Sequence, residues 1–276
     1  MKFAFLFLLI LLSACSEQDV EETGGKIKAA VSTITYADFV KQVGGENVDI
    51  IHLIPAGVDP HDFEPNFNRV KKIADADIYF RIGEIFTIEN NWIQTIKAAN
   101  ENIEIADCSD GINIRNNNPH IWLGLEEVKT IVENICRAFV KIDTASADYY
   151  KHNKEVFISR IDSLNDQLKQ DFDQLTKKEV LVYHPAWRYF LSRYGLEEIS
   201  IEKDGKEPKA KDLHNLIDYA KLKGIKAIFI EPQFDIKAAS TIADEIGAQI
   251  VMLNPIPEDF FVNINDIREK FMKYLK

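Results

Sequence analysis

The feature that most constrains the fold is one long helical pattern in the middle of the chain. From Ser146 onward, apolar side chains recur in steps of three and four, at Phe157, Ile161, Leu164, Leu168, Phe172 and Leu175. A helix over residues 146–176 would be about 45 Å long at about 1.5 Å per residue. Because a helix of that length spans both halves of a protein of this size, we expect a rigid connector. A coiled-coil or partner-binding helix is the alternative.

Strand and helix patterns alternate on both sides of this helix. Before it, apolar runs lie near 26–32, 48–54, 77–82 and 103–106, and a second helical stretch, 125–140, directly precedes the long one. After it, apolar runs at 179–184, 196–202, 226–230 and 248–253 alternate with helices that end at glycines. Such alternation indicates right-handed crossovers in mostly parallel sheets. The sequence therefore predicts an α/β protein with two mostly parallel-sheet lobes, 26–142 and 179–276, joined by a connecting segment, 143–178, that holds the long rigid helix.

The first residues resemble an export signal rather than a part of the fold. Lys2 precedes an unbroken apolar run, 3–12, which is too short for a membrane-spanning helix of about 20 residues. The small residues that end the signal peptide, 1–14, lead directly into Cys15, as in the lipobox of bacterial lipoproteins, where this cysteine is acylated. An ordinary secretory signal is the alternative, and both predict export. The acidic stretch 15–25 ends in Gly-Gly and is expected to be a flexible tether.

Charge and cysteine content narrow the possible partners. Removal of the signal with Lys2 leaves 32 basic against 44 acidic side chains, a net charge of −12. So acidic a surface argues against nucleic acid and anionic membrane as partners and mildly favours cations. With Cys15 assigned to lipid, Cys108 and Cys136 remain, and whether they form a disulfide stays open.

Three histidines stand beside prolines at the ends of apolar runs or loops. His61 follows Pro60 in the turn after the run 48–54, His120 follows Pro119 at the end of an irregular loop, and His184 precedes Pro185 after the run 179–184. In α/β proteins, ligand-binding side chains lie where strands end. Three neutral imidazoles favour zinc over calcium or magnesium, which prefer oxygen ligands. With two histidines from the first lobe and one from the second, the metal is predicted to lie in the cleft between the lobes.

Four motifs in order carry a family resemblance: V-D-P-H-D-F-E-P (58–65), N-P-H-I-W-L (118–123), Y-H-P-A-W-R-Y-F-L-S-R-Y-G-L (183–196) and E-P-Q-F-D-I-K-A-A (231–239). Over about residues 27–275 the chain resembles the metal-binding solute-binding proteins of bacterial ABC transporters (zinc/manganese type, cluster A-I). The resemblance implies two α/β lobes tied by a long rigid helix with the metal between them. It places the histidine ligands on His61, His120 and His184, and it gives Glu231 an outer-shell or occasional ligand role.

Two departures from that family concern the metal. The family's usual fourth ligand is an Asp in a segment similar to L-D-P-L, whereas this chain has Asn254 in L-N-P-I. The fourth position is therefore open between Asn254, Glu231, Asp59 and water. Many zinc-specific relatives also carry a loop rich in His and Asp before the second histidine, but here that loop reads GINIRNNN. This absence weakens the case for zinc scavenging and for zinc over manganese.

The remaining polar and aromatic residues receive structural interpretations. His52 is expected on a strand, His152 and His214 on solvated helix faces, and the carboxylates of Glu197, Glu198 and Glu202 on a solvated edge. Three aromatic residues flank the histidines and would exclude water from the site: Trp122, Tyr183 and Trp187.

The expected function is that of an exported, lipid-anchored binding protein facing the periplasm or cell exterior. It would capture Zn²⁺, or Mn²⁺ as the second choice, and deliver it as a monomer to an ABC permease in the inner membrane, without enzymatic activity. Because the ligands must be neutral His, whose reference pKa is about 6.5, affinity should fall as the pH drops through about 6. The alternatives are a periplasmic zinc hydrolase, since three His with an open position also suit catalytic zinc, and an adhesin that keeps metal for structure.

Overall fold

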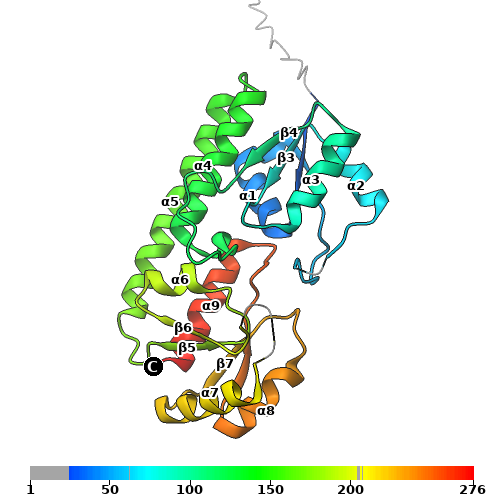
Figure 1. Cartoon of the computed structure of the whole chain (residues 1–276). Helices are drawn as coiled ribbons and strands as arrows, with labels where there is room; N and C mark the ends of the chain where they lie inside the picture. Colours follow the sequence, from blue (N-terminus) through cyan, green and yellow to red (C-terminus); the bar gives the residue numbers. More distant parts are fainter. Residues whose placement is uncertain (1–24, 62, 204–205, 207) are drawn as a thin grey trace, which may run out of the picture.

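The structure is a computed structural model, and it describes residues 25–61, 63–203, 206 and 208–276. The expected signal peptide, the lipidation site Cys15 and the tether up to residue 24 lie outside the described residues. In the part that is described, two sheets form two lobes, with a long helix running along both (Figure 1). No helix of this part is long and apolar enough to cross a membrane.

The first lobe is a four-stranded parallel sheet with helices around it. Its strands are β1 (Ile27–Val31), β2 (Val48–His52), β3 (Ile78–Arg81) and β4 (Glu104–Asp107), in the order β2-β1-β3-β4. Its helices are α1 (Ile34–Gly44), α2 (Phe67–Ala74) and α3 (Ile88–Ala99), with a 3₁₀ turn η1 (Gly45–Asn47) after α1. The central strand β1 ends in Ala29, Ala30 and Val31, all fully buried, because helices cover both faces of the sheet.

The second lobe repeats this topology without a visible sequence repeat. Its strands are β5 (Glu179–Val182), β6 (Glu197–Ser200), β7 (Ala227–Ile230) and β8 (Gln249–Met252), in the order β6-β5-β7-β8 and all parallel. Its helices are α6 (Arg188–Arg193), α7 (Ala210–Lys223), α8 (Ile236–Ile246) and α9 (Phe260–Tyr274). Gly224 and Gly247 close α7 and α8 at positive φ (63° each), a conformation that glycine adopts without steric cost. The predicted two-lobed α/β class is confirmed.

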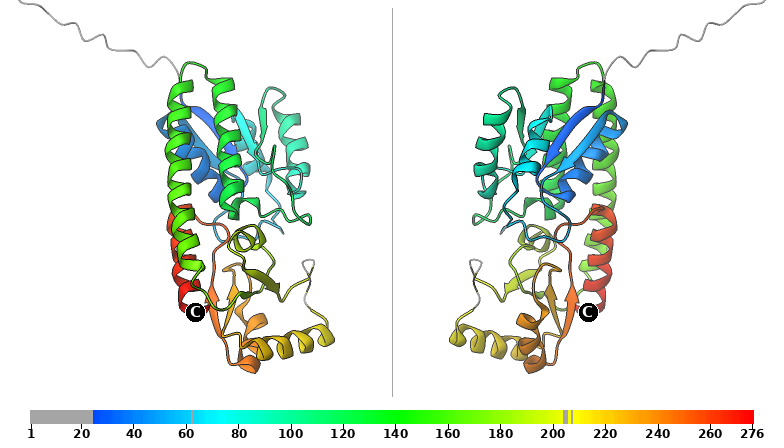
Figure 2. Two further views of the ribbon diagram at one scale, coloured as in Figure 1. Left: turned by 90° about the vertical axis from the view of Figure 1, so that its left-hand side faces the viewer. Right: turned by 90° about the vertical axis from the view of Figure 1, so that its right-hand side faces the viewer.

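The second helix of an antiparallel pair connects the lobes. A 3₁₀ turn, η2 (Ile121–Leu123), leads into α4 (Leu125–Ile142), and α5 (Ala147–Phe172) returns along it. The 26 residues of α5 span about 39 Å at about 1.5 Å per residue. The helix ends four residues before the predicted boundary, because its last turn tightens and Leu175 donates to the carbonyl of Phe172. Figure 2 shows α9 (red) lying against one end of α5 (green).

One hydrophobic core crosses from lobe to lobe. A single cluster of buried residues includes Val31 and Phe80 of the first sheet together with Phe229 and Val251 of the second. The segment between β8 and α9 also reaches the first lobe, where the carbonyl of Pro257 accepts a hydrogen bond from Thr35 (2.9 Å). Cys108 and Cys136 are both buried in this core and are free thiols. The two lobes therefore pack together as one body. The cleft between them is lined by the three histidines.

Candidate metal centre

His61 is carried by the loop between β2 and α2. The carboxylate of Asp59 accepts a hydrogen bond from the backbone N–H of His61 (2.9 Å), an Asx turn that orients the peptide. Asn66 caps α2 by accepting from the N–H of Arg69 (3.1 Å), so the loop ends at a defined helix start. His61 itself is exposed, which leaves its ring accessible from the cleft.

His120 immediately precedes η2 and is buried, with 5% of its surface exposed. The backbone before it turns through Asn116 and Asn117, both at positive φ (50° and 54°), a conformation that Asn tolerates better than most residues. The side-chain oxygen of Asn118 then accepts from the backbone N–H of His120 (2.9 Å) and lies 2.7 Å from its ring Nδ1. The Asn run of the sequence thus builds the turn that places His120 and holds its ring.

His184 lies two residues beyond the end of β5. Its Nδ1 is 2.6 Å from a carboxylate oxygen of Glu202, which follows β6, the strand next to β5. The prediction that Glu198 and Glu202 form a solvated edge is wrong. Glu202 is 8% exposed, and the carboxylate of Glu198 is buried where it accepts from the backbone N–H of Trp187 (2.6 Å). Only Glu197 of the three is exposed.

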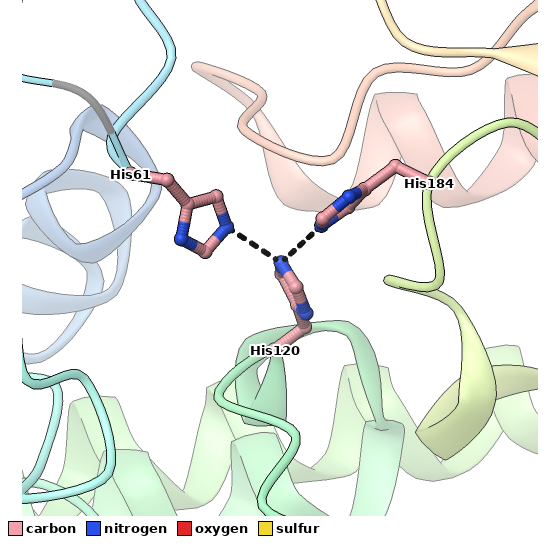
Figure 3. A group of neighbouring side chains, drawn as sticks. All are labelled: His61, His120 and His184. Atoms are coloured by element: carbon pink, nitrogen blue, oxygen red, sulfur yellow. Dashed lines mark hydrogen bonds between the residues drawn. The ribbon is translucent and has the colours of Figure 1, made fainter. Parts of the chain in front are cut away.

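The three rings converge on one point. Nε2 of His120 lies 3.3 Å from Nε2 of His61 and 3.4 Å from Nε2 of His184, and the candidate ligand atoms all lie within 4.8 Å of one another (Figure 3). Two nitrogens bound to one zinc at about 2.0–2.1 Å in tetrahedral geometry are about 3.3–3.4 Å apart. The two distances from Nε2 of His120 therefore match the spacing of ligand nitrogens in a zinc site.

The ring protons point away from this centre. A neutral imidazole carries one N–H, and both His120 and His184 have an oxygen acceptor on Nδ1. With the proton on Nδ1, the Nε2 atoms of His120 and His184 each present a lone pair to the other. Because neither Nε2 carries a hydrogen, the two atoms cannot form a hydrogen bond. A cation placed between them removes that repulsion, which makes the arrangement suited to a metal.

Aromatic rings enclose the histidines. Trp122 packs edge-on against His120, with ring centroids 5.2 Å apart, and Phe234 stacks on His184 at 5.4 Å. Phe86 contacts His61 at 6.0 Å. Trp122 is tied across the cleft by its Nε1, which donates to the carbonyl of Pro255 (2.8 Å). Aromatic rings thus line much of the inner side of the centre, and such low-polarity surroundings strengthen electrostatic interactions with a bound cation.

Among the candidates for a fourth ligand, Glu231 lies in the same small pocket as the three histidines. It is 1% exposed, and one of its oxygens accepts from Nε1 of Trp187 (3.0 Å). Its other oxygen, Oε2, has no hydrogen-bond partner among the described residues. Burial raises the pKa of Glu231 to about 7 in spite of the Trp187 hydrogen bond and the nearby His184.

Asn254 occupies a different place. Its side-chain oxygen accepts from the backbone N–H of Ile256 (3.0 Å), and the residue lines a separate cleft with Ala56 and Val262. Asp59 lines the pocket of the histidines but also accepts from the N–H of His61.

The electrostatic environment differs among the three histidines. Burial, helped by His184 and His61 nearby, holds the pKa of His120 well below its usual 6.5. Burial also acts against a charge on His184, but the hydrogen bond to Glu202 and the carboxylates of Glu231 and Asp59 outweigh it and raise the pKa of His184 above 6.5. His120 is therefore neutral at physiological pH, whereas His184 binds a proton more readily than a free histidine does.

A wider cavity of about 710 Å³ leads from the histidines to the surface. Asp59, Asn117, Arg188 and Lys203 are among its lining residues. The other histidines lie elsewhere: His52 ends β2 half-buried, and His152 and His214 are exposed on α5 and α7. Within the described residues, the group able to hold a metal consists of His61, His120 and His184.

Comparison with known proteins identifies relatives over most of the chain. Residues 30–264 match the family model described as zinc-uptake complex component A, periplasmic. The chain is 27% identical over 283 residues to the high-affinity zinc uptake system protein ZnuA of Bacillus subtilis, covering 92% of this chain and 89% of that protein. It is 25% identical over 266 residues to the manganese ABC transporter substrate-binding lipoprotein PsaA of Streptococcus anginosus, covering 89% and 85%.

Solved structures agree with the sequence relatives. A crystal structure of ZnuA superimposes with a TM-score of 0.86 at 31% identity, over 91% of this chain and 100% of that one. A zinc-bound deletion mutant of ZnuA gives the same TM-score, 0.86, at 32% identity, over 91% and 98%. The likeness covers both lobes and the helix between them.

Proposed function

This chain belongs to the zinc-uptake complex component A family, and we infer from that membership and from its convergent histidines that it captures a divalent transition metal and delivers it to an ABC transporter for import. The observation that carries the proposal is the convergence of three histidines, with Nε2 of His120 lying 3.3 Å from Nε2 of His61 and 3.4 Å from Nε2 of His184. Zinc is the first choice, because neutral imidazoles suit zinc better than manganese, which prefers carboxylate and water oxygens.

The test is a chelator-competition titration, with zinc and then with manganese, of a protein that begins at Ser16 and so lacks the signal peptide and the proposed lipid anchor at Cys15. We expect one zinc per chain with a dissociation constant well below about one micromolar, and weaker manganese binding. Removal of the metal by chelator should leave the protein folded, because the lobes share a core that does not depend on the metal. Weak or non-stoichiometric zinc binding would contradict the proposal.

We propose Glu231 as the fourth group around the metal. Its unpartnered oxygen lies in the pocket of the histidines, whereas the side-chain oxygen of Asn254 is engaged by Ile256. Glu231→Gln keeps the shape of the side chain but removes its charge, and zinc affinity should fall about 10- to 100-fold. Asn254→Asp should leave the affinity within about threefold, since that residue lines another cleft. A large gain in Asn254→Asp with no loss in Glu231→Gln would reverse the two assignments.

Zinc affinity should fall as the pH is lowered, starting above pH 6.5. Metal binding requires neutral imidazole, so a proton competes with the metal for each ring. Because the pKa of His184 is raised above 6.5, this competition begins at higher pH than for a free histidine, while His120 stays neutral. If one proton must leave His184 before the metal binds, the zinc affinity falls about tenfold for each pH unit below the pKa of His184. Titrations between about pH 8 and pH 5 measure this slope, and a flat profile would contradict it.

We further propose that the protein is exported and anchored by lipid on Cys15, in line with the lipoprotein names of several relatives. It would act as a monomer in which residues 26–142 and 179–276 are the lobes and 143–178 the connector. We assign no enzymatic step to the chain: the family is a transporter component, and no observation favours the hydrolase or the adhesin.

A further inference from the structure

Glu202 is a buried carboxylate that the metal-binding function does not by itself require. It is 8% exposed and lines the outer cavity, with Oε2 2.6 Å from Nδ1 of His184. An ionised carboxylate is acceptor-only, so the imidazole must be the donor in this bond. The contact therefore places the proton of neutral His184 on Nδ1 and leaves the lone pair of Nε2 facing His120.

The backbone holds Glu202 at this position. Beyond the last residue of β6, the N–H of Ile201 donates to the carbonyl of Val182 (2.9 Å), and the N–H of Glu202 donates to the carbonyl of Tyr183 (2.9 Å). The pairing of β5 and β6 thus continues until the residue before His184. Because the histidine and the glutamate are carried by the ends of two adjacent paired strands, their relative position is set by the sheet.

The equivalent bond on His120 is made by a neutral group. The amide oxygen of Asn118 lies 2.7 Å from Nδ1 of His120. Hydrogen bonds to an ionised acceptor are roughly twice as strong as neutral ones, and a carboxylate on Nδ1 makes the other ring nitrogen a better metal donor. Glu202 also supplies negative charge beside a centre whose three histidine ligands are neutral.

We propose that Glu202 is a positioning residue that acts on the metal through His184. It selects the tautomer of His184, holds the imidazole ring in its orientation toward the cleft and makes Nε2 a stronger electron-pair donor to the metal. This inference rests on the proposed metal-binding function. It is specific to Glu202, because Glu197, at the start of the strand β6 that leads to Glu202, is exposed.

Three variants separate this role from general effects of charge or stability. Glu202→Ala removes the acceptor, Glu202→Gln keeps an acceptor oxygen but removes the charge, and Glu197→Gln removes the same charge from the exposed position. Zinc affinity is measured for each by chelator competition. Nitrogen NMR of the metal-free proteins at a pH where the rings are neutral reports which nitrogen of His184 carries the proton.

We expect Glu202→Ala to bind zinc up to about 100-fold more weakly and to lose the preference for the Nδ1–H tautomer. Glu202→Gln should keep that tautomer and lose about tenfold in affinity, and Glu197→Gln should match the unaltered protein. The proposal is overturned if Glu202→Ala keeps both the tautomer and the affinity, or if Glu197→Gln loses as much as Glu202→Gln. Failure of the unaltered protein to bind zinc would instead refute the metal-binding function, whereas the NMR signal would still show whether Glu202 sets the tautomer.

Discussion

Replacing His120 with alanine should lower the affinity for zinc by roughly 60- to 700-fold. His120 is the middle one of the three proposed ligands, with its Nε2 within 3.4 Å of the Nε2 atoms of both other histidines. Structural zinc sites with four ligands contribute about 10–16 kcal/mol, so an equal share for one ligand is about 2.5–4 kcal/mol. Because about 1.4 kcal/mol corresponds to a factor of ten, loss of one ligand amounts to roughly 60- to 700-fold.

The measurement is the same chelator competition, with His214→Ala as the matched control. His214 is exposed on α7, where it lies 3.5 Å from Asp218, and its removal should leave zinc binding unchanged. The His120 variant should remain folded, since its pocket is also lined by Trp122 and Phe234. Nearly unchanged zinc affinity in a folded His120→Ala protein would place the metal elsewhere.

Replacing Phe157 with alanine should destabilise the whole protein by about 3–5 kcal/mol, the usual cost of removing a buried phenylalanine. Phe157 lies on α5 and is 1% exposed. Its ring centroid is 6.0 Å from that of Phe39 in α1 and 5.0 Å from that of Phe261 in α9. The side chain therefore joins the connecting helix to an element of each lobe.

Urea unfolding followed by circular dichroism measures this effect, and Val156→Ala is the control. Val156 precedes Phe157 on the same helix but is 48% exposed, so its truncation should change the stability by no more than about 0.5 kcal/mol. Because the lobes share one core, the Phe157 variant should unfold in a single transition at lower urea concentration. Two transitions, of which only one moves, would show that the lobes unfold independently.

Much of the fold could be predicted from the sequence because its signals are local. The apolar runs, the glycines after the helices and the steps of three and four between Phe157 and Leu175 each depend on a few neighbouring residues. These patterns indicated two parallel-sheet lobes and one long helix, as the structure has them. The apolar pattern predicts an end of that helix four residues too late, because Leu175 continues the pattern although the backbone has already left the helix.

The three histidines could be predicted for the same reason, since each stands beside a proline where an apolar run or loop ends. What the sequence alone determined is therefore the class of fold, the three candidate ligands and the kind of metal that imidazoles favour.

Only the tertiary structure decided which polar groups surround the histidines. In the sequence, Glu202 resembles the other acidic residues of the surface, and the fourth position stays open between Asn254, Glu231, Asp59 and water. Contacts between Glu202 and His184 arise from the pairing of β5 with β6, and the unpartnered oxygen of Glu231 arises from burial beside Trp187. Both depend on residues that are far apart in the chain, so no local pattern could have shown them.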